Sequence, residues 1–356
     1  MNTLPDFPWD RLEPYKERAR AHPDGIVDLS VGTPVDPVPR IIQDALAAAA
    51  DSPGYPTTHG TAELREAAAG WLLRRHGVRV GRRDVLPVIG TKELVAWLPT
   101  LLGAGRVVFP ELAYPTYDVG ARLAGAATLA SDGLLSLGPE HADLVWVNSP
   151  GNPTGRVLPT EHLRKVVAWA RERGTVVASD ECYIELGWEE RPVSILHPDV
   201  CDGSHEGLLA VHSLSKRSNL AGYRAGFVTG DPALVKRLLE TRKHAGMMVP
   251  APVQAAMTAA LADDRHADEQ REIYGARRAR LRPALERAGW RVDHSTAGLY
   301  FWASNGENCW DQVGKLSDIG ILVAPGDFYG SAGSQHIRIA VTATDERVDA
   351  ALRRLQ

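Results

Sequence analysis

The residues best suited to chemistry are Lys216, the serines Ser213 and Ser215 before it, and Arg224 eight positions after it. Apolar residues precede and follow this segment, so the lysine is expected on a turn between two buried strands. A lysine that is held still, and whose pKa is lowered by burial or by nearby cations, can attack a carbonyl group. Hydroxyl groups and a guanidinium beside it would suit a phosphate dianion. Taken alone, the segment is equally consistent with a solvated Lys-Arg turn.

Three other polar segments share one property, which is that each follows a predicted strand. They are Asn148–Gly155 after the strand 143–148, Ser179–Tyr183 at the end of the strand 175–180, and Gly90–Lys92 after the strand 84–89. The last of these also begins a predicted helix, whose exposed N–H groups and dipole can bind an anion. In a doubly wound sheet the carboxyl ends of the strands form the edge at which ligands bind. We therefore expect a carboxylate, an amide, a phenol, an amine and an anion site to converge on one crevice.

This set of groups matches the needs of a phosphorylated pyridine aldehyde as a cofactor. The lysine would hold it, a carboxylate would keep its ring nitrogen protonated, polar side chains would bind its phenolate oxygen, and the glycine turn would bind its phosphate. Asp180 carries the most weight, because a carboxylate buried at a strand end without a partner would be costly.

The composition is that of an ordinary globular protein, with 356 residues of which 44% are hydrophobic and 24% charged. This length allows two domains and a large core. The net charge of -4 and the lack of a basic stripe argue against a nucleic-acid partner. The N-terminus lacks the features of a signal peptide, and no apolar stretch is long enough to span a membrane. A cytoplasmic enzyme with small-molecule substrates is therefore expected.

Cysteines and histidines give no indication of a metal site. The three cysteines, Cys182, Cys201 and Cys309, form no CxxC pair and suit free thiols in a reducing compartment. The 12 histidines show no ligand spacing. Cys182 lies close to Asp180 and is interpreted as a small core residue and not as a nucleophile.

Strands and helices alternate along most of the chain. Strands are predicted at 84–89, 106–109, 125–130, 143–148, 175–180, 207–212 and 224–229. Helices are predicted at 10–21, 39–50, 61–77, 91–102, 115–123, 160–173, 232–245, 251–262 and 264–288. Most of the strands are continuous apolar runs, which indicates a sheet covered on both faces. On the predicted helix 264–288, four arginines are expected on a solvated face, namely Arg277, Arg278, Arg280 and Arg282.

After Trp290 the pattern changes to short strands mixed with helices. The strands are predicted at 291–293, 298–303, 321–323 and 336–341, and the helices at 308–319 and 344–355. The fold class is therefore predicted as α/β, with a large doubly wound, mostly parallel sheet domain and a smaller α+β domain. The large domain is expected to span residues 40–245. The smaller one is expected to combine an N-terminal arm, 1–39, with residues 246–356.

The order and spacing of the polar residues resemble those of the class I and II aminotransferases, which are fold-type-I enzymes that depend on pyridoxal 5′-phosphate (PLP). The resemblance extends over almost the whole chain and rests on Asn152-Pro153-x-Gly155, Asp180-x-x-Tyr183, Ser213-x-Ser215-Lys216 and Arg224. It implies PLP as the cofactor and amino acids and keto acids as substrates. It also implies a homodimer whose active sites lie at the subunit interface.

The resemblance implies a role for each matching residue. Lys216 would bind the cofactor covalently and later carry the Cα proton, and Asp180 would pair with the pyridinium nitrogen. The other cofactor contacts would come from Asn152 and Tyr183 to the ring oxygen, from Ser213, Arg224 and the backbone of Thr91 and Lys92 to the phosphate, and from Tyr114, with Tyr117 as the alternative, to the ring face.

Residues outside this core of the site are implied as well. Tyr55 matches a tyrosine that reaches the phosphate of the neighbouring subunit, and the alternative is an ordinary loop aromatic. Arg338 matches the arginine that binds the substrate α-carboxylate as a bidentate fork, and the alternative is a structural ion pair. Gly32 and Asn152 would add contacts to the substrate.

The substrate follows from a narrower resemblance. Residues 215–227 and the compact length most resemble actinobacterial N-succinyldiaminopimelate aminotransferases. Those enzymes exchange the amino group of glutamate with N-succinyl-2-amino-6-ketopimelate in the biosynthesis of diaminopimelate and lysine. Arg217 departs from many relatives, in which an asparagine follows the lysine. It is expected to face solvent, with contact to an anionic substrate as the alternative.

Three alternative functions remain open. An aminotransferase of aspartate or aromatic type would differ only in its substrate. A PLP-dependent C–S β-lyase would share Lys216 and Asp180 but would release pyruvate and ammonia. A PLP-binding regulatory module would carry a DNA-binding helix-turn-helix ahead of this fold, and only about forty residues precede the first core helix, so this alternative is the least expected.

Overall fold

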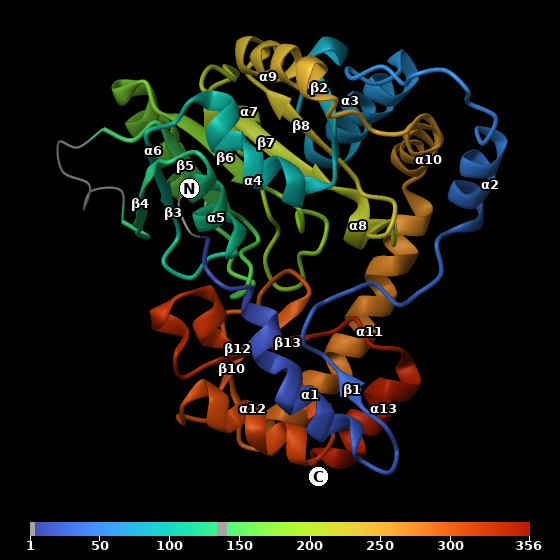
Figure 1. Ribbon diagram of the computed structural model, residues 1–356, viewed down its shortest axis with the longest axis vertical. Helices are drawn as coiled ribbons and strands as arrows, with labels where there is room; N and C mark the ends of the chain where they lie inside the picture. Colours follow the sequence, from blue (N-terminus) through green and yellow to red (C-terminus); the bar gives the residue numbers. More distant parts are fainter. Residues whose placement is uncertain (1–3, 134–140) are drawn as a thin grey trace.

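A seven-stranded sheet forms the centre of the larger part of the molecule (Figure 1). In the computed structural model, which describes residues 4–133 and 141–356, the strand order is β2-β8-β7-β6-β5-β3-β4. The strands are β2 (Val85–Ile89), β3 (Arg106–Phe109), β4 (Ala127–Ala130), β5 (Leu144–Asn148), β6 (Val176–Asp180), β7 (Leu208–Ser213) and β8 (Ala225–Gly230). The pairs from β4 to β7 are parallel, whereas β8 is antiparallel to both of its neighbours. The predicted strands and the mostly parallel α/β sheet are therefore confirmed.

Helices cover both faces of this sheet, as its continuous apolar strands indicated. On one face lie α4 (Thr91–Leu102), α5 (Thr116–Leu123) and α9 (Pro232–Ala245). On the other lie α3 (Ala62–His76), α6 (Thr160–Arg173), α7 (Pro198–Cys201) and α10 (Ala251–Ala262), with α2 (Arg40–Ala48) beside α10. Strand β5 shows the division, because Leu144 and Trp146 pack against the first group while Val145 and Val147 pack against the second.

Local signals in the sequence set the helix boundaries near the sheet. The Thr61 hydroxyl accepts a hydrogen bond from the Leu64 N–H at 3.2 Å and so caps the first turn of α3. Gly77 ends this helix with a φ of 68°, a conformation that glycine adopts without strain. The predicted turn between β2 and the next helix is also present, because α4 begins at Thr91 directly after β2 and Gly90.

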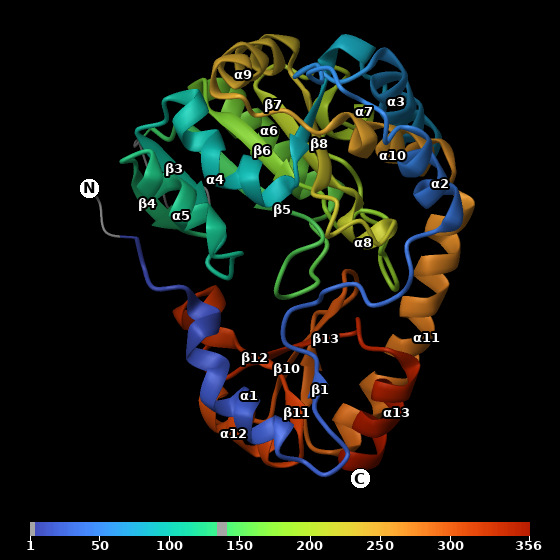
Figure 2. The same cartoon turned by 45° about the vertical axis from the view of Figure 1, so that its right-hand side comes forward.

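A smaller unit combines the N-terminal segment with the C-terminal residues (Figure 2). Its antiparallel sheet has the order β12-β13-β10-β9, and β1 pairs in parallel with β11. The elements are α1 (Glu13–Arg20), β1 (Val27–Asp28), β9 (Arg291–Asp293), β10 (Tyr300–Ser304), α12 (Cys309–Asp318), β11 (Ile321–Leu322), β12 (Ala324–Pro325), β13 (Ile337–Ala340) and α13 (Asp345–Arg354). The domain limits near residues 40 and 245 stay a prediction, and residues 1–3 of the predicted arm lie outside the described residues.

The long helix α11 (Arg265–Arg287) runs along one side of the molecule from the large sheet to the smaller unit (Figures 1 and 2). Neither this helix nor any other in the described part of the chain is both long and apolar enough to cross a membrane.

The first helix is shorter than predicted. The sequence predicts one helix over 10–21, but a 3-10 turn at Pro8–Leu12 precedes α1, which begins at Glu13. Pro14 explains the difference, because proline has no backbone N–H and fits only the first turn of an α-helix.

The prediction of a solvated arginine face on α11 is wrong for Arg277 and Arg278, which are only 3% and 6% exposed. Arg277 forms a fork with Asp36, at 2.6 and 2.8 Å, and a further bond to Asp345 at 2.9 Å. Arg278 bonds Glu189 at 3.2 Å. These carboxylates come from distant segments that cover α11. The charge of an arginine was therefore not sufficient to predict that it is exposed to solvent.

The buried residue His212 is expected to make the stability of the fold depend on pH. His212 lies on β7 with its ring centroid 5.2 Å from that of Trp71 and 5.0 Å from that of Phe227. Burial, with a further contribution from His76, lowers the pKa of His212 to about 3. The unfolded chain therefore takes up a proton below the usual pKa of 6.5 that the folded chain does not, and the folded state loses stability as the pH falls from there.

We expect His212→Phe to remove this acid sensitivity. The free energy of unfolding of the variant, relative to wild type, should rise by about 1.4 kcal/mol for each pH unit below about 6.5. Denaturant titrations between about pH 7 and pH 5 measure it. The carboxylate of Glu181 lies 3.7 Å from the imidazole, and burial raises its pKa to about 7. Both proteins are therefore compared in a Glu181→Gln background, so that only position 212 differs in titration. A difference that stays constant with pH would contradict the prediction.

Candidate active site

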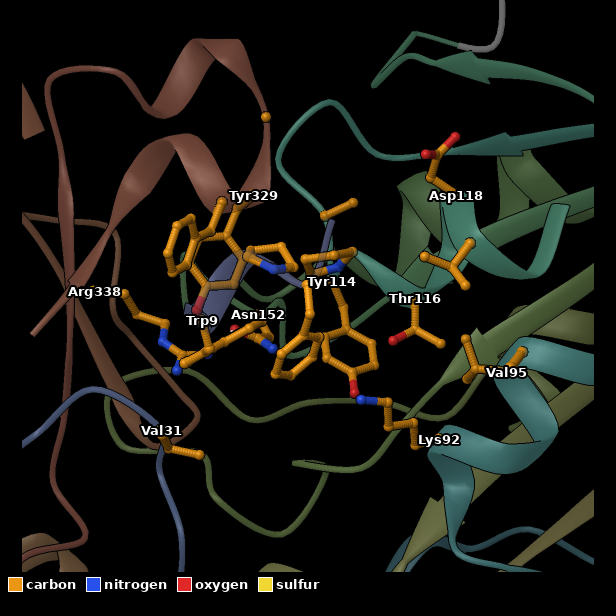
Figure 3. A pocket seen from close by; sticks show the side chains of 18 of the residues that line it. Trp9, Val31, Lys92, Val95, Tyr114, Thr116, Asp118, Asn152, Tyr329 and Arg338 are labelled. Carbon is orange, nitrogen blue, oxygen red and sulfur yellow. The ribbon is translucent and has the colours of Figure 1, made fainter. Parts of the chain in front are cut away.

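A cavity of about 1240 Å³ opens at the carboxyl ends of β5, β6 and β7, between the large sheet and the smaller unit (Figure 3). Ten of the twelve predicted site residues line it, namely Thr91, Lys92, Tyr114, Asn152, Asp180, Tyr183, Ser213, Lys216, Arg224 and Arg338. Figure 3 shows that Arg338 enters from the smaller unit while Lys92 enters from α4 on the opposite side. Segments more than a hundred residues apart in the sequence thus meet at one cavity.

Lys216 lies on α8 (Leu214–Arg217), a single helical turn that follows β7. The Ser213 hydroxyl begins this turn by accepting a hydrogen bond from the Ser215 N–H at 3.1 Å. The Lys216 Nζ donates to the carbonyl oxygen of Gly32 at 2.7 Å. Burial, opposed by Tyr300, lowers the pKa of Lys216. A lowered pKa leaves more of the amine neutral and nucleophilic.

Asp180 ends β6 and is 7% exposed. Its Oδ2 accepts a hydrogen bond from the Tyr117 hydroxyl at 2.8 Å, and its Oδ1 accepts one from the Cys182 N–H at 3.2 Å. Burial raises the pKa of this carboxyl group, although both hydrogen bonds oppose the effect. The described residues give Asp180 no ion pair, so a ligand that brings a positive charge would stabilise the carboxylate.

The N-terminus of α4 and two cations form the positive end of the cavity. Gly90 has a φ of 70°, and a side chain there would overlap the guanidinium of Arg224, which lies against this turn. The Arg224 Nη1 donates to the carbonyl oxygen of Ala221 at 2.8 Å. Burial and the nearby Arg224 both lower the pKa of Lys92. Cations and helical N–H groups at one point favour an anion.

Arg338 forms the opposite end and is 2% exposed. Its Nη1 donates to the Asn152 side-chain oxygen at 2.9 Å, and its Nη2 donates to the Ser30 carbonyl at 2.5 Å. The guanidinium lies 3.9 Å from the ring centroid of Tyr300 and 4.9 Å from that of Tyr329. Within residues 4–133 and 141–356 no carboxylate pairs with it, and its Nε has no partner. A buried cation of this kind suits a ligand carboxylate.

Two tyrosines define the ring-binding wall. Tyr114 faces the cavity, whereas Tyr117 lies behind it, stacked on Trp146 with ring centroids 4.9 Å apart. The hydroxyls of Tyr183 and Tyr300 are 3.0 Å apart. Tyr300 was missed by the sequence reasoning. The signal for it is the pairing of β10 with β13, in which Tyr300 lies two residues from the partner of Arg338 and therefore on the same face.

Two predicted site residues lie elsewhere. Gly32 does not line the cavity but contacts Lys216 through its carbonyl, as described above. Tyr55 is 98% exposed and lies outside the cavity of its own chain, so its expected contact with a neighbouring subunit stays a prediction.

Of two interpretations of single residues, the one for Cys182 agrees with the structure and the one for Arg217 is wrong. Cys182 packs against a buried hydrophobic cluster, and it also lines the cavity, where its Sγ lies 3.3 Å from the Thr91 hydroxyl oxygen. Burial raises the pKa of its thiol, which disfavours the thiolate. Arg217 faces neither solvent nor the cavity. It is 5% exposed and pairs with Glu185 in the interior, a partner that nothing near Arg217 in the sequence indicates.

The chain as a whole is similar to proteins of one family. The profile of aminotransferase class I and II matches residues 24–355. The 4-dedimethylamino-4-oxo-anhydrotetracycline transaminase OxyQ of Streptomyces rimosus is 64% identical over 358 residues, and the match covers 100% of both chains. A probable aminotransferase of Mycobacterium tuberculosis is 66% identical over 357 residues, covering 99% of this chain and 85% of that protein. Among solved structures, a probable N-succinyldiaminopimelate aminotransferase from Thermus thermophilus superposes with a TM-score of 0.88 at 29% identity, covering 98% of this chain and 99% of the other.

Proposed function

The chain belongs to the class I and II aminotransferases, and on that premise we propose that the cavity around Lys216 transfers an amino group from glutamate to a 2-oxo acid. One observation carries the proposal. Arg338 and Lys216 are anchored on the same segment, through the carbonyls of Ser30 at 2.5 Å and Gly32 at 2.7 Å. The group suited to a substrate carboxylate and the amine suited to the adjacent carbon are therefore held in a fixed relation.

Class I and II aminotransferases depend on PLP and have the fold known as fold type I. This chain has that fold and belongs to that PLP-dependent family. The residues around the cavity fit the cofactor. Its phosphate matches the positive end at Gly90 and Arg224, where a side chain on the glycine would leave no room. A protonated ring nitrogen would supply the positive charge that buried Asp180 lacks within the described residues.

The proposed roles of the protein groups follow from this arrangement. When bound, PLP supplies an electron sink for negative charge at the substrate Cα. Lys216 would hold the cofactor through its Nζ and, once the substrate amine has displaced it, the freed Nζ would move the proton at the substrate Cα. Asp180 holds the ring-nitrogen proton. The other cofactor contacts are proposed for Asn152, Tyr183, Tyr114, Ser213, Arg224, and the backbone of Thr91 and Lys92.

We expect Arg338→Lys to weaken substrate binding more than chemistry. Lysine keeps the charge but loses the planar fork, so the KM for glutamate should rise roughly tenfold to a hundredfold. Steady-state assays that follow 2-oxoglutarate measure it. Arg291→Lys, at an arginine whose side chain is 71% exposed, is the matched control. An unchanged KM in Arg338→Lys would contradict the proposal that Arg338 binds the substrate carboxylate.

For the amino acceptor we propose N-succinyl-2-amino-6-ketopimelate. Support comes from residues 215–227 and from the name of the Thermus thermophilus relative. A second candidate is a polycyclic ketone, of the kind named for OxyQ. That relative is 64% identical over its full length, and Trp9, Phe328 and Tyr329 give the cavity an aromatic wall on which fused rings could stack.

A panel of acceptors separates these candidates. The enzyme would be supplied with PLP, glutamate and one acceptor at a time, and the 2-oxoglutarate formed would be measured. The proposal predicts the highest kcat/KM for N-succinyl-2-amino-6-ketopimelate, ahead of oxaloacetate, aromatic 2-oxo acids and the polycyclic ketone. A preference for the ketone would select the second candidate. Pyruvate and ammonia released from cystathionine, without amino transfer, would instead indicate a C–S β-lyase.

Exposed Tyr55 also supports a homodimer, in which it reaches the cofactor phosphate of the partner. Sedimentation of the PLP-loaded protein tests this proposal, and a monomer at assay concentration with full activity would contradict it.

A further inference from the structure

Arg217 directly follows Lys216 but points in another direction. Successive residues of a helical turn project about 100° apart, so one turn of helix can aim two neighbours at different targets. The Lys216 Nζ reaches the Gly32 carbonyl at 2.7 Å, on the cavity side. The Arg217 Nε donates instead to Glu185, and its Nη1 donates to the Ala260 carbonyl at 2.9 Å. Both side chains are therefore fixed at their far ends.

Glu185 belongs to the segment that carries the other half of the proposed site. It lies two residues after Tyr183 and five after Asp180, and its side chain is 7% exposed. Although burial raises it, the attraction of Arg217 brings the pKa of Glu185 to about 2, so the pair is ionised at neutral pH. The pair thus joins the segment that carries Lys216 to the segment that carries Asp180 and Tyr183, behind the wall of the cavity.

A wider network holds Glu185 in place. Arg75 of α3 donates to it from Nε at 2.9 Å, and the same guanidinium forms a fork with Asp268 of α11 at 2.5 and 3.2 Å. The Trp71 ring lies 5.5 Å from the Arg217 guanidinium. Burying an ion pair is costly, and apolar side chains of similar volume often replace such a pair without loss of stability. The feature that this pair has and apolar packing lacks is directed hydrogen bonding, from Arg217 to Glu185 and to the Ala260 carbonyl, which sets the geometry between the two segments.

We propose that Arg217 is a positioning residue, which fixes the rotation of α8 through Glu185 and so aims the Lys216 Nζ at the reacting carbon. This inference rests on the proposed function of the site. Arg217 itself does not line the cavity, so it acts only through the lysine beside it.

The test compares Arg217→Met, Arg217→Lys, Glu185→Gln and the double variant Arg217→Met/Glu185→Gln, all loaded with PLP. Single-turnover reaction with glutamate gives the rate per bound cofactor and the glutamate concentration at half-maximal rate. We expect Arg217→Met to lower the rate roughly tenfold to a hundredfold, because small misplacements of a reacting group have effects of this size. Half-saturation should stay within about twofold of wild type, because Arg338 is untouched.

Three further results are expected. Arg217→Lys should recover part of the rate. The double variant should be no slower than Arg217→Met, because the two residues act as one unit. Arg278→Met, which removes another buried arginine paired with a carboxylate, should lower stability without slowing the rate per bound cofactor.

Several results would overturn the inference. They are a wild-type rate in folded Arg217→Met, additive losses in the double variant, or an equal loss in Arg278→Met. If Arg217→Met fails to fold, Arg217→Lys and Glu185→Gln carry the test, and wild-type rates in both would overturn it. A wild-type protein that binds no PLP or ignores glutamate would overturn the proposed function itself, a result distinct from all of these.

Discussion

Replacing Lys216 by alanine is expected to lower the rate of amino transfer by about 10⁴-fold or more. The amine is both the group that binds the cofactor and the group that moves the Cα proton in the proposed mechanism. Among the described residues its Nζ donates a hydrogen bond only to the Gly32 carbonyl, so alanine removes the reactive amine together with that one hydrogen bond. Turnover of glutamate with a 2-oxo acid at saturating PLP measures the effect.

Lys165→Ala is the matched control for this experiment. Lys165 lies on α6, its side chain is 73% exposed, and it pairs with Glu161 on the surface. We expect wild-type turnover from this variant. Circular dichroism and thermal unfolding of Lys216→Ala should match wild type measured without PLP. Substantial turnover in folded Lys216→Ala would contradict the role of the lysine.

Asp180→Asn is expected to produce the second largest loss, with kcat falling by roughly 10²- to 10³-fold. Asparagine is nearly the same shape. Its oxygen can accept the hydrogen bond from the Cys182 N–H, and its NH2 group can donate to the Tyr117 hydroxyl oxygen in place of the bond that Oδ2 accepts. It cannot balance a positive charge on the cofactor ring, so the ring nitrogen would lose its proton more readily. Single-turnover kinetics with glutamate would report the slower proton transfer at the substrate Cα.

The stability of the same variant gives an independent check. Burial raises the pKa of Asp180 above its unfolded value, so the charged carboxylate destabilises the folded chain as the pH rises through the folded pKa. Without PLP, Asp180→Asn should therefore be at least as stable as wild type at neutral pH. A variant that is less stable without PLP and as active as wild type with it would contradict the assignment.

The large sheet could be predicted because its signals are local. A buried strand in a parallel sheet is a short continuous apolar run, and here glycine, proline or polar residues bound each run. The polar residues that follow Asn148, Asp180 and Ser213 then had to meet, because β5, β6 and β7 are neighbours in one parallel array. This is why most of the cavity could be named in advance.

The remaining features depend on partners that lie far away in the sequence. Arg277 is buried because it meets Asp36, which is 241 positions away, and Arg217 is buried because it meets Glu185. A charged residue shows by itself only that it needs a partner or water, and local patterns do not distinguish the two. The break before α1 is a different case, because Pro14 was visible and its effect on the first turn was overlooked.

The most direct test of the account is chemical trapping of the cofactor on the protein. The PLP-loaded enzyme would be reduced with borohydride, digested and mapped by mass spectrometry, once as purified and once after incubation with glutamate. The account predicts a pyridoxyl group on the peptide that contains Lys216 in the first sample, and strong loss of that label in the second. A label on another lysine, or no label at any lysine, would contradict the central claim that Lys216 carries the cofactor. A label that glutamate leaves unchanged would contradict the claim that glutamate is the amino donor.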